Sequence, residues 1–503
     1  MKSKNRRVKR GLSILTAAAL LFGTLFTGVR AQAETCSCKE IPRIGLHGIN
    51  EPMLLNAGTP EEKEVVIVDA SALQDAILPM AEKIICAAAT QSWDAGADAL
   101  AIFANSLFGL VKCDENGDSI APITNEPRLD PQQDHKQNHD YNFEYDWRLD
   151  PMESARKLDA FIKQVQRQTG HEKVVLQPHS EGGLVVSAYL AQFGSGALEH
   201  IIPLMCAFNG LTMVGDLFNR RVSLSAKGLS DYLSALLGEE GEMGVLTAAV
   251  EVLHQAGLLL PVVNALQLLI DNVGDRLYQE ALIPIFGQMP ALWGFVPDKD
   301  YESAKASMLD GSKHAKLIEK LDDYHYNAGA KTVALLRQAE ESGTKVSIIA
   351  TYGFPGMPVS PGAVNLTDGL IDTALESCGA TTARYGEALP EDYVQKVDDG
   401  HSHISPDRMV DASTCAFPEQ TWFITGQTHF SFGVGALQDY LVYSEKQPTV
   451  HGSRAFPQFL ARQAEDTLVP AQTPAATAQV TLLSSIFTLM RRVIVLLVEM
   501  VAG

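Results

Sequence analysis

The chain has 503 residues, with 60 Asp and Glu against 40 Lys and Arg, and its formal net charge is −20. An acidic protein repels phosphate backbones, so nucleic acid is excluded as an expected partner. The length exceeds that of a usual single domain and favours one core that carries a large insertion over three separate modules.

Residues 1–33 have the features of a secretory signal peptide. A basic stretch precedes an apolar run from Leu12 to about Val29, and Ala31-Gln32-Ala33 supplies small residues at the cleavage positions. We expect cleavage after Ala33 and a secreted, extracellular protein that is either free or associated with the cell surface. Removal of the segment's seven basic residues leaves 33 Lys and Arg against 60 Asp and Glu, a formal charge of −27.

Strand and helix patterns alternate along residues 34–210, the expected first part of the core. Short apolar runs predict strands, and longer segments with helical spacing predict helices. The predicted strands are 42–46, 141–147, 173–176 and 200–205, and the predicted helices are 65–112, 151–169 and 182–192. This alternation predicts the α/β class, with a mainly parallel sheet and right-handed crossovers.

The alternation stops at residue 211. Residues 211–343 have long helical patterns and few strand signals, and residues 344–460 resume the core with predicted strands at 345–352 and 421–425. The sequence therefore predicts a large helical insertion between two strands of the sheet, which we expect to cover the site as a lid.

The C-terminal part begins with a predicted linker, residues 461–480, which contains a Pro/Ala/Thr-rich stretch. Residues 481–503 predict an apolar amphipathic helix. Arg491 and Arg492 lie in its middle, which argues against a membrane-spanning helix. We expect this helix to lie on a membrane surface, or to dock on the body of the protein or on a partner.

The most informative segment is Lys173–Tyr189. A β-branched run ends in Pro178-His179-Ser180-Glu181-Gly182-Gly183, and an apolar helical pattern follows at once. This arrangement is typical of a nucleophile elbow, in which a serine sits on a tight turn between a strand and a helix. Pro178 replaces the usual first glycine, and because proline is compact we expect the turn to survive.

A nucleophilic serine needs a base that takes its proton and a carboxylate that orients the base. In this fold the chain order is serine, acid, histidine, which removes every histidine before Ser180. His429 follows the predicted strand 421–425 after a short turn and is the predicted base. His401 and His403 lie in a polar loop without a preceding strand and rank lower.

Two aspartates between residue 352 and the base qualify as the acid. Asp368 and Asp407 each begin a segment of similar pattern, and we prefer Asp407 while Asp368 remains the alternative. The predicted oxyanion donors are the backbone N–H of Glu181, directly after the serine, and that of Ile49, just past His47-Gly48.

The sequence assigns no cofactor and no metal. Asp398, Asp399, His401 and His403 are residue types that bind zinc or calcium, but a solvated polar loop is the commoner explanation of such a group. The cysteines number seven, so at least one lacks an intramolecular partner, and Cys378 with Cys415 is a candidate disulfide.

Several motifs resemble the lecithin:cholesterol acyltransferase family, including its bacterial lipase-like members. The resemblance rests on Tyr145-Asp146-Trp147-Arg148-Leu149-Asp150-Pro151 followed by a helix and His179-Ser180-Glu181-Gly182-Gly183. Phe208-Asn209-Gly210 is similar to a segment of that family, and so is Asp407–Ser413, with Arg408 and Met409 as departures. The resemblance implies an α/β-hydrolase fold, a Ser-Asp-His triad and lipid acyl esters as substrates.

The sequence thus predicts a secreted serine esterase or lipase that forms an acyl-enzyme at Ser180. One alternative is a phospholipid:alcohol O-acyltransferase, and another is a non-catalytic surface-binding protein on the same fold.

Overall fold

The computed structural model describes residues 40–49, 53–65, 79, 82, 83, 86, 90, 92–236, 241–431, 433–464, 467–473, 486 and 488–492. The predicted signal peptide and most of the predicted C-terminal helix lie outside these described residues.

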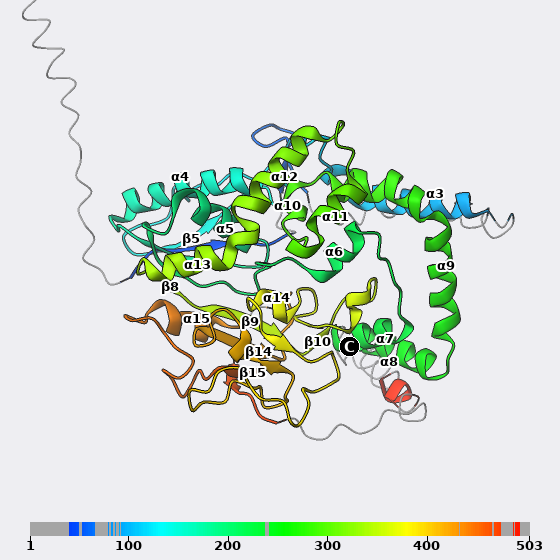
Figure 1. Ribbon diagram of the computed structural model, residues 1–503. Coiled ribbons are helices and arrows are strands. Elements are labelled where there is room, and N and C mark those ends of the chain that lie inside the picture. The colour runs from blue at the N-terminus through cyan, green and yellow to red at the C-terminus, as the bar shows by residue number, and fades with distance from the viewer. Residues whose placement is uncertain are drawn as a thin grey trace, which may run out of the picture.

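A central, mainly parallel sheet runs through the molecule (Figure 1). One part has five strands in the order β5 (Asp140–Phe143), β1 (Arg43–Leu46), β6 (Val174–Pro178), β7 (Leu198–Ile201) and β8 (Lys345–Val346), and the other has four in the order β9 (Ile348–Tyr352), β14 (Thr421–Thr425), β15 (Phe459–Ala464) and β16 (Thr467–Pro470). All of these pairs are parallel except β15 with β16. Strand β9 is buried along its whole length, as expected for a parallel sheet covered on both faces.

The two halves of the sheet are joined where the chain leaves β7. Leu204 forms parallel bridges with His179 on one side and with Ile349 on the other. Strands β8 and β9 are separated by one residue, Ser347, whose N–H still donates to the carbonyl of Ile201. The carboxyl ends of β6, β9 and β14 therefore meet at one edge of the sheet.

Helices cover both halves of the sheet. In Figure 1, α4 (Pro151–Thr169), α5 (Gly182–Phe193) and α13 (Thr332–Glu341) lie in the upper part, and α14 (Thr373–Glu376) and α15 (Gly435–Val442) lie in the lower part. Local chemistry sets the bounds of α4. Asp150 caps its N-terminus by accepting a hydrogen bond from the Met152 N–H, and Gly170 ends it at a positive φ of 74°.

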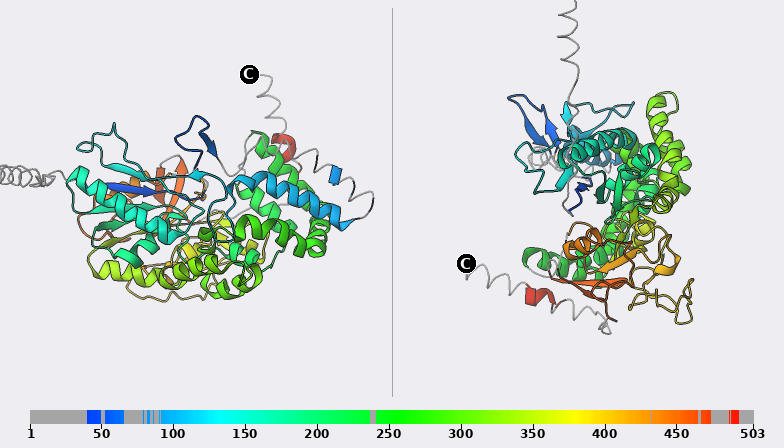
Figure 2. Two further views of the ribbon diagram at one scale, coloured as in Figure 1. Left: turned by 90° about the horizontal axis from the view of Figure 1, so that it is seen from above. Right: turned by 90° about the vertical axis from the view of Figure 1, so that its left-hand side faces the viewer.

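The predicted insertion is helical in the structure and lies between β7 and β8. Its elements are α6 (Thr212–Phe218), α7 (Ala226–Leu236), α8 (Gly241–Gln255), α9 (Leu259–Leu277), the π-helix η2 (Tyr278–Gly287), α10 (Pro290–Trp293), α11 (Asp298–Met308) and α12 (Ala315–Asn327), followed by α13. Helix α9 lies beside α3 (Trp93–Phe108) at one end of the molecule, as Figure 1 and the view from above in Figure 2 show.

Short strands outside the central sheet form antiparallel pairs. They are β2 (Met53–Leu55) with β3 (Lys63–Val65) and β4 (Ile123–Thr124), β10 (Phe354–Pro355) with β11 (Leu366–Thr367), and β12 (Thr381–Thr382) with β13 (Val410–Asp411).

Two sequence expectations need correction. The residues predicted to begin the linker at 461 instead continue the sheet, because β15 pairs with β14 and turns back into β16. Cys378 and Cys415 are not bridged, and both thiols are buried and free.

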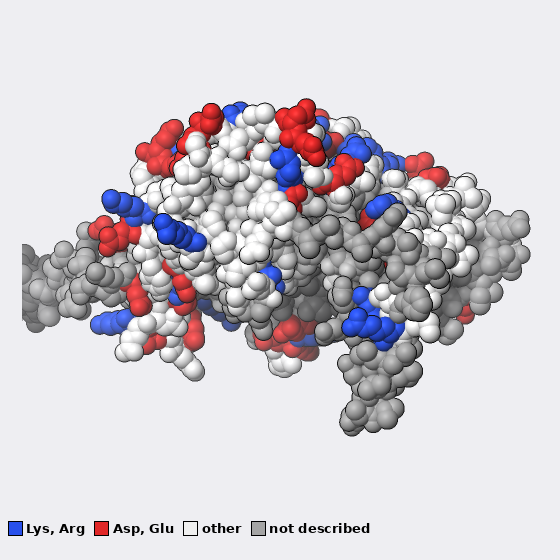
Figure 3. Space-filling view, turned by 90° about the horizontal axis from the view of Figure 1, so that it is seen from below, with Lys and Arg blue, Asp and Glu red and all other residues white. Residues whose placement is uncertain are grey.

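Within the described residues, no single helix has the length and apolar character needed to cross a membrane. One pair, Gly244–Gln255 with Leu259–Gly287, meets that test of length and composition together but is bent by 89°. On the face in Figure 3, acidic and basic side chains of the described residues are interspersed and form no continuous basic surface.

Candidate active site

Ser180 lies on a strained turn between β6 and α5. Its φ is +54°, a left-handed conformation that is uncommon for residues other than glycine. The N–H of Ser180 donates to the carbonyl of Leu204, and that of Gly182 donates to the carbonyl of His179, which closes the turn. Backbone strain of this kind is typical of a nucleophile elbow, so the replacement of the first glycine by Pro178 has not removed the turn.

Small residues allow the elbow to approach its neighbours. A side chain on Gly183 would place Cβ 2.7 Å from Cβ of Cys206, and one on Gly182 would meet the backbone of Leu46 at 3.0 Å. The two glycines after the serine are therefore required by close packing of α5 against the adjoining strand ends.

His429 bridges the serine and a buried carboxylate. Its Nε2 lies 2.9 Å from Oγ of Ser180, and its Nδ1 lies 2.6 Å from Oδ2 of Asp368. The backbone N–H of His429 also donates to the carbonyl of Asp368. His429 follows β14, as the sequence predicts, and is 4% exposed.

The carboxylate in this chain is Asp368, the alternative acid, and not the preferred Asp407. Asp368 is fully buried, and its Oδ1 accepts hydrogen bonds from the N–H groups of Leu370 (2.8 Å) and Ile371 (2.6 Å). These two donors leave Oδ2 to face His429. A carboxylate held in this way fixes the tautomer of His429 with the proton on Nδ1, so that Nε2 can accept the serine proton.

Asp407 makes its hydrogen bonds within its own turn. Its Oδ1 accepts from Oγ of Ser405 at 2.5 Å and from the N–H of Met409 at 3.0 Å. The turn precedes β13, which pairs with β12 away from the end of β14. Asp368 instead directly follows β11, in the segment after β9, and β9 is the parallel neighbour of β14, the strand that leads to His429.

The two predicted oxyanion donors flank the serine. The N–H of Glu181 stands at the start of α5, and no acceptor for it or for the N–H of Ile49 occurs among the described residues. Gly48 packs directly on Ser180, since a Cβ there would lie 2.7 Å from Cβ of Ser180. The His47–Ile49 backbone therefore runs past the serine hydroxyl.

A buried network that the sequence did not predict ties these two segments together. The Tyr145 hydroxyl lies 2.5 Å from Oε2 of Glu181 and 2.7 Å from the carbonyl of His47. Burial raises the pKa of Glu181 to about 8, with Asp146 adding to the rise and Tyr145 opposing it. Because the phenol has one proton and the His47 carbonyl can only accept, a protonated Glu181 completes the network by donating to Tyr145.

Two further titratable groups adjoin the triad. Burial, and next the neighbouring His429, lower the pKa of His179 to about 3, so His179 is neutral at pH 7. Burial, and next the charge of Asp368, raise the pKa of Glu376 well above its ordinary value. His179 therefore places no positive charge next to His429 at pH 7.

The Asp146-Trp147-Arg148 motif has a structural role in this molecule. The Arg148 guanidinium is fully buried and binds both carboxylate oxygens of Asp146, at 2.9 and 2.6 Å. It also donates to the carbonyl of Val111 and to Oγ of Ser119. The motif thereby fixes the segment that presents Tyr145.

The helical insertion contacts the loop that carries Asp368. The Tyr232 hydroxyl of α7 donates to the carbonyl of Gly369 at 2.9 Å, and Leu236 of α7 packs where a side chain on Gly369 would lie. The insertion therefore packs against the loop that carries Asp368.

No protein-family model and no curated protein matches the sequence. Among solved structures, the crystal structure of the Tle4-Tli4 complex is similar at 14% identity, covering 36% of this chain and 48% of that one with a TM-score of 0.20. The chain thus spans about half the length of that match. The esterase RhEst1 from Rhodococcus sp. ECU1013 is similar at 11% identity, covering 81% of this chain and 92% of that one with a TM-score of 0.23. Both TM-scores are low, so the chemistry of the site rests on its own geometry.

Proposed function

We propose that this protein is a secreted serine hydrolase that cleaves carboxylic esters of lipid acyl groups through an acyl-enzyme on Ser180. The hydrogen-bonded chain from Ser180 through His429 to Asp368 carries this proposal. It follows from the same proposal that the mixed α/β core is an α/β-hydrolase fold.

In the first half of the reaction, Oγ of Ser180 attacks the ester carbonyl while Nε2 of His429 removes its proton. Asp368 stabilises the imidazolium that forms. His429 then gives the proton to the leaving alcohol, and the acyl group remains on Ser180. In the second half, His429 takes a proton from water, the resulting hydroxide attacks the acyl carbon, and the proton returns to Ser180 as the acid leaves.

The tetrahedral intermediates carry a negative charge on the former carbonyl oxygen. The N–H groups of Glu181 and Ile49 are the donors for this oxyanion, and the N-terminus of α5 adds a favourable dipole. A neutral Glu181 side chain avoids a second negative charge next to the oxyanion, which is why its raised pKa suits catalysis.

The helical insertion has an exposed apolar surface, which suits contact with lipid esters. Large apolar side chains that are 41–60% exposed occur along α8, the following turn and α9: Leu246, Leu253, Leu258, Leu260, Val262, Leu266 and Leu268. Exposed apolar surface of this kind is typical of contact with an apolar partner. We propose that this surface meets the lipid and that the insertion acts as a lid. Arg492 adjoins this surface, since it donates to the carbonyl of Gly244 in α8.

Hydrolysis of p-nitrophenyl esters of increasing chain length tests the proposal. We expect turnover that rises with chain length and is lost in Ser180→Ala. No turnover of any ester by the wild-type chain contradicts the proposal. A product ester that appears when an alcohol is added identifies acyl transfer in place of hydrolysis.

A further inference from the structure

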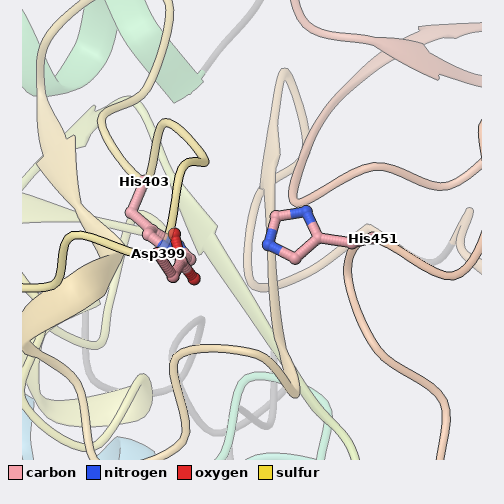
Figure 4. Close-up of side chains that lie close together, drawn as sticks. All are labelled: Asp399, His403 and His451. Atoms are coloured by element: carbon pink, nitrogen blue, oxygen red, sulfur yellow. The ribbon is translucent and has the colours of Figure 1, made fainter.

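A second cluster of chemically active side chains lies outside the triad. Asp399, His403 and His451 each offer one ligand atom, and these three atoms lie within 4.8 Å of one another; Figure 4 shows the three side chains. Asp399 and His403 belong to the long loop between β12 and β13, whereas His451 precedes β15. We propose that these residues form a zinc-binding site that clamps the two segments together.

The first argument is the tautomer of His403, which Gln458 determines. The Gln458 amide nitrogen donates to two carbonyls, those of Pro418 at 2.6 Å and Thr421 at 3.4 Å. Its oxygen therefore faces Nδ1 of His403, at 2.8 Å, and requires a proton on Nδ1. The neutral ring then has its lone pair on Nε2. An acceptor that orients the second nitrogen is the usual arrangement around a metal-binding histidine.

The second argument is the contact that this lone pair makes. Nε2 of His403 lies 3.0 Å from Oδ2 of Asp399, which is itself an acceptor. Two acceptors at this distance repel each other unless a cation lies at their junction. His403 is fully buried, whereas Asp399 is exposed and opens the junction to solvent, from which a metal ion can enter. A metal ion that binds both atoms removes this repulsion.

The geometry suits zinc. Tetrahedral Zn²⁺ with bonds of about 2.1 Å places its ligand atoms about 3.4 Å apart, close to the separation of the Asp399 and His403 atoms. His451 is exposed and has to approach by about 1.4 Å at most, a shift that an exposed loop side chain permits. Two imidazoles and one carboxylate favour zinc over calcium or magnesium, which prefer oxygen ligands.

The surroundings support a cation and hold the loop in place. The carboxylate of Glu419 lies near His451. The ring of His401 stacks on that of His451 with centroids 3.7 Å apart. Asp399 is fixed by the N–H of His401, and the N–H of His403 donates to Gln395.

Zinc binding by the tag-free full chain tests this site. After treatment with EDTA and dialysis, we expect calorimetric titration to show one Zn²⁺ bound per chain, and zinc to raise the melting temperature. Co²⁺ in the same site is expected to give the visible absorption of a tetrahedral ion. His451→Ala should abolish the Co²⁺ absorption and the shift in melting temperature, whereas His254→Ala on α8 should keep both.

Two outcomes overturn the site. One is a wild-type chain that takes up no zinc. The other is a His451→Ala chain that binds zinc as the wild type does. Because neither readout depends on ester hydrolysis, failure here is distinguishable from failure of the proposed function.

Discussion

Replacement of Asp368 by asparagine changes one atom in the proposed triad and has a consequence that the hydrogen bonds define. The N–H groups of Leu370 and Ile371 both point at Oδ1 of Asp368, so an asparagine must turn its carbonyl oxygen toward them. Its NH₂ group then faces Nδ1 of His429 and donates to it. The histidine proton is forced onto Nε2, where it faces Oγ of Ser180 instead of a lone pair.

The expected loss in Asp368→Asn follows from this wrong tautomer. Because the variant also lacks the charge that stabilises the imidazolium, kcat should fall about ten-thousand-fold. Such a loss corresponds to a barrier higher by ~5 kcal/mol. The substitution preserves shape and both backbone hydrogen bonds, so KM should change little.

Asp407→Asn is the matched control. The asparagine carbonyl can still accept from Ser405 and Met409, so its rate of ester hydrolysis should remain near that of the wild type. Steady-state kinetics on a p-nitrophenyl ester, with circular dichroism to verify folding, measure both variants. A large loss of kcat in Asp407→Asn together with an active Asp368→Asn would refute the assignment of the acid.

Three further predictions concern the surroundings of the triad. Because the pKa of Glu181 is about 8, this side chain is neutral below that pH and negative above it, so kcat should fall as the pH rises through about 8. In Glu181→Gln the amide donates to Tyr145 as the acid does, and the pH–rate profile should lose this fall. An unchanged profile would contradict the role of a neutral Glu181 in the reaction. Gly48→Ala places a methyl group 2.7 Å from Cβ of Ser180. We therefore expect kcat to fall at least a hundredfold, roughly the effect of losing an oxyanion donor. A near-normal kcat would show that this loop does not line the oxyanion site. Asp146→Ala leaves the buried Arg148 guanidinium without its carboxylate. The free energy of unfolding, measured by urea denaturation, should fall by about 3–5 kcal/mol. A loss below about 1 kcal/mol would show that other groups neutralise the arginine.

The serine and the histidine could be predicted because local sequence determines both positions. Ser180 lies on a turn that a strand, small residues and an apolar helix define within a few residues of one another. His429 follows a strand whose β-branched and aromatic residues are recognisable. The large helical insertion was equally visible, since strand signals disappear along its whole length.

The acid could not be predicted because its position depends on which strands are neighbours. Asp368 and Asp407 begin similar segments, and the choice between them needs the pairing of β9 with β14. The Glu181–Tyr145 contact joins residues 36 positions apart, and its protonation state depends on burial. The pairing of β15 with β14 also joins distant parts of the chain. Because of this pairing, the residues from 461 that were expected to begin a linker belong to the sheet.

Labelling with an alkyl fluorophosphonate, followed by intact-mass and peptide mass spectrometry, tests the central claim most directly. The reagent reacts with a serine hydroxyl only when a base and an oxyanion site activate it. We predict one adduct per chain, located on Ser180, and no adduct in Ser180→Ala. A wild-type chain that remains unlabelled, or that is labelled at a residue other than Ser180, would contradict the proposed nucleophile.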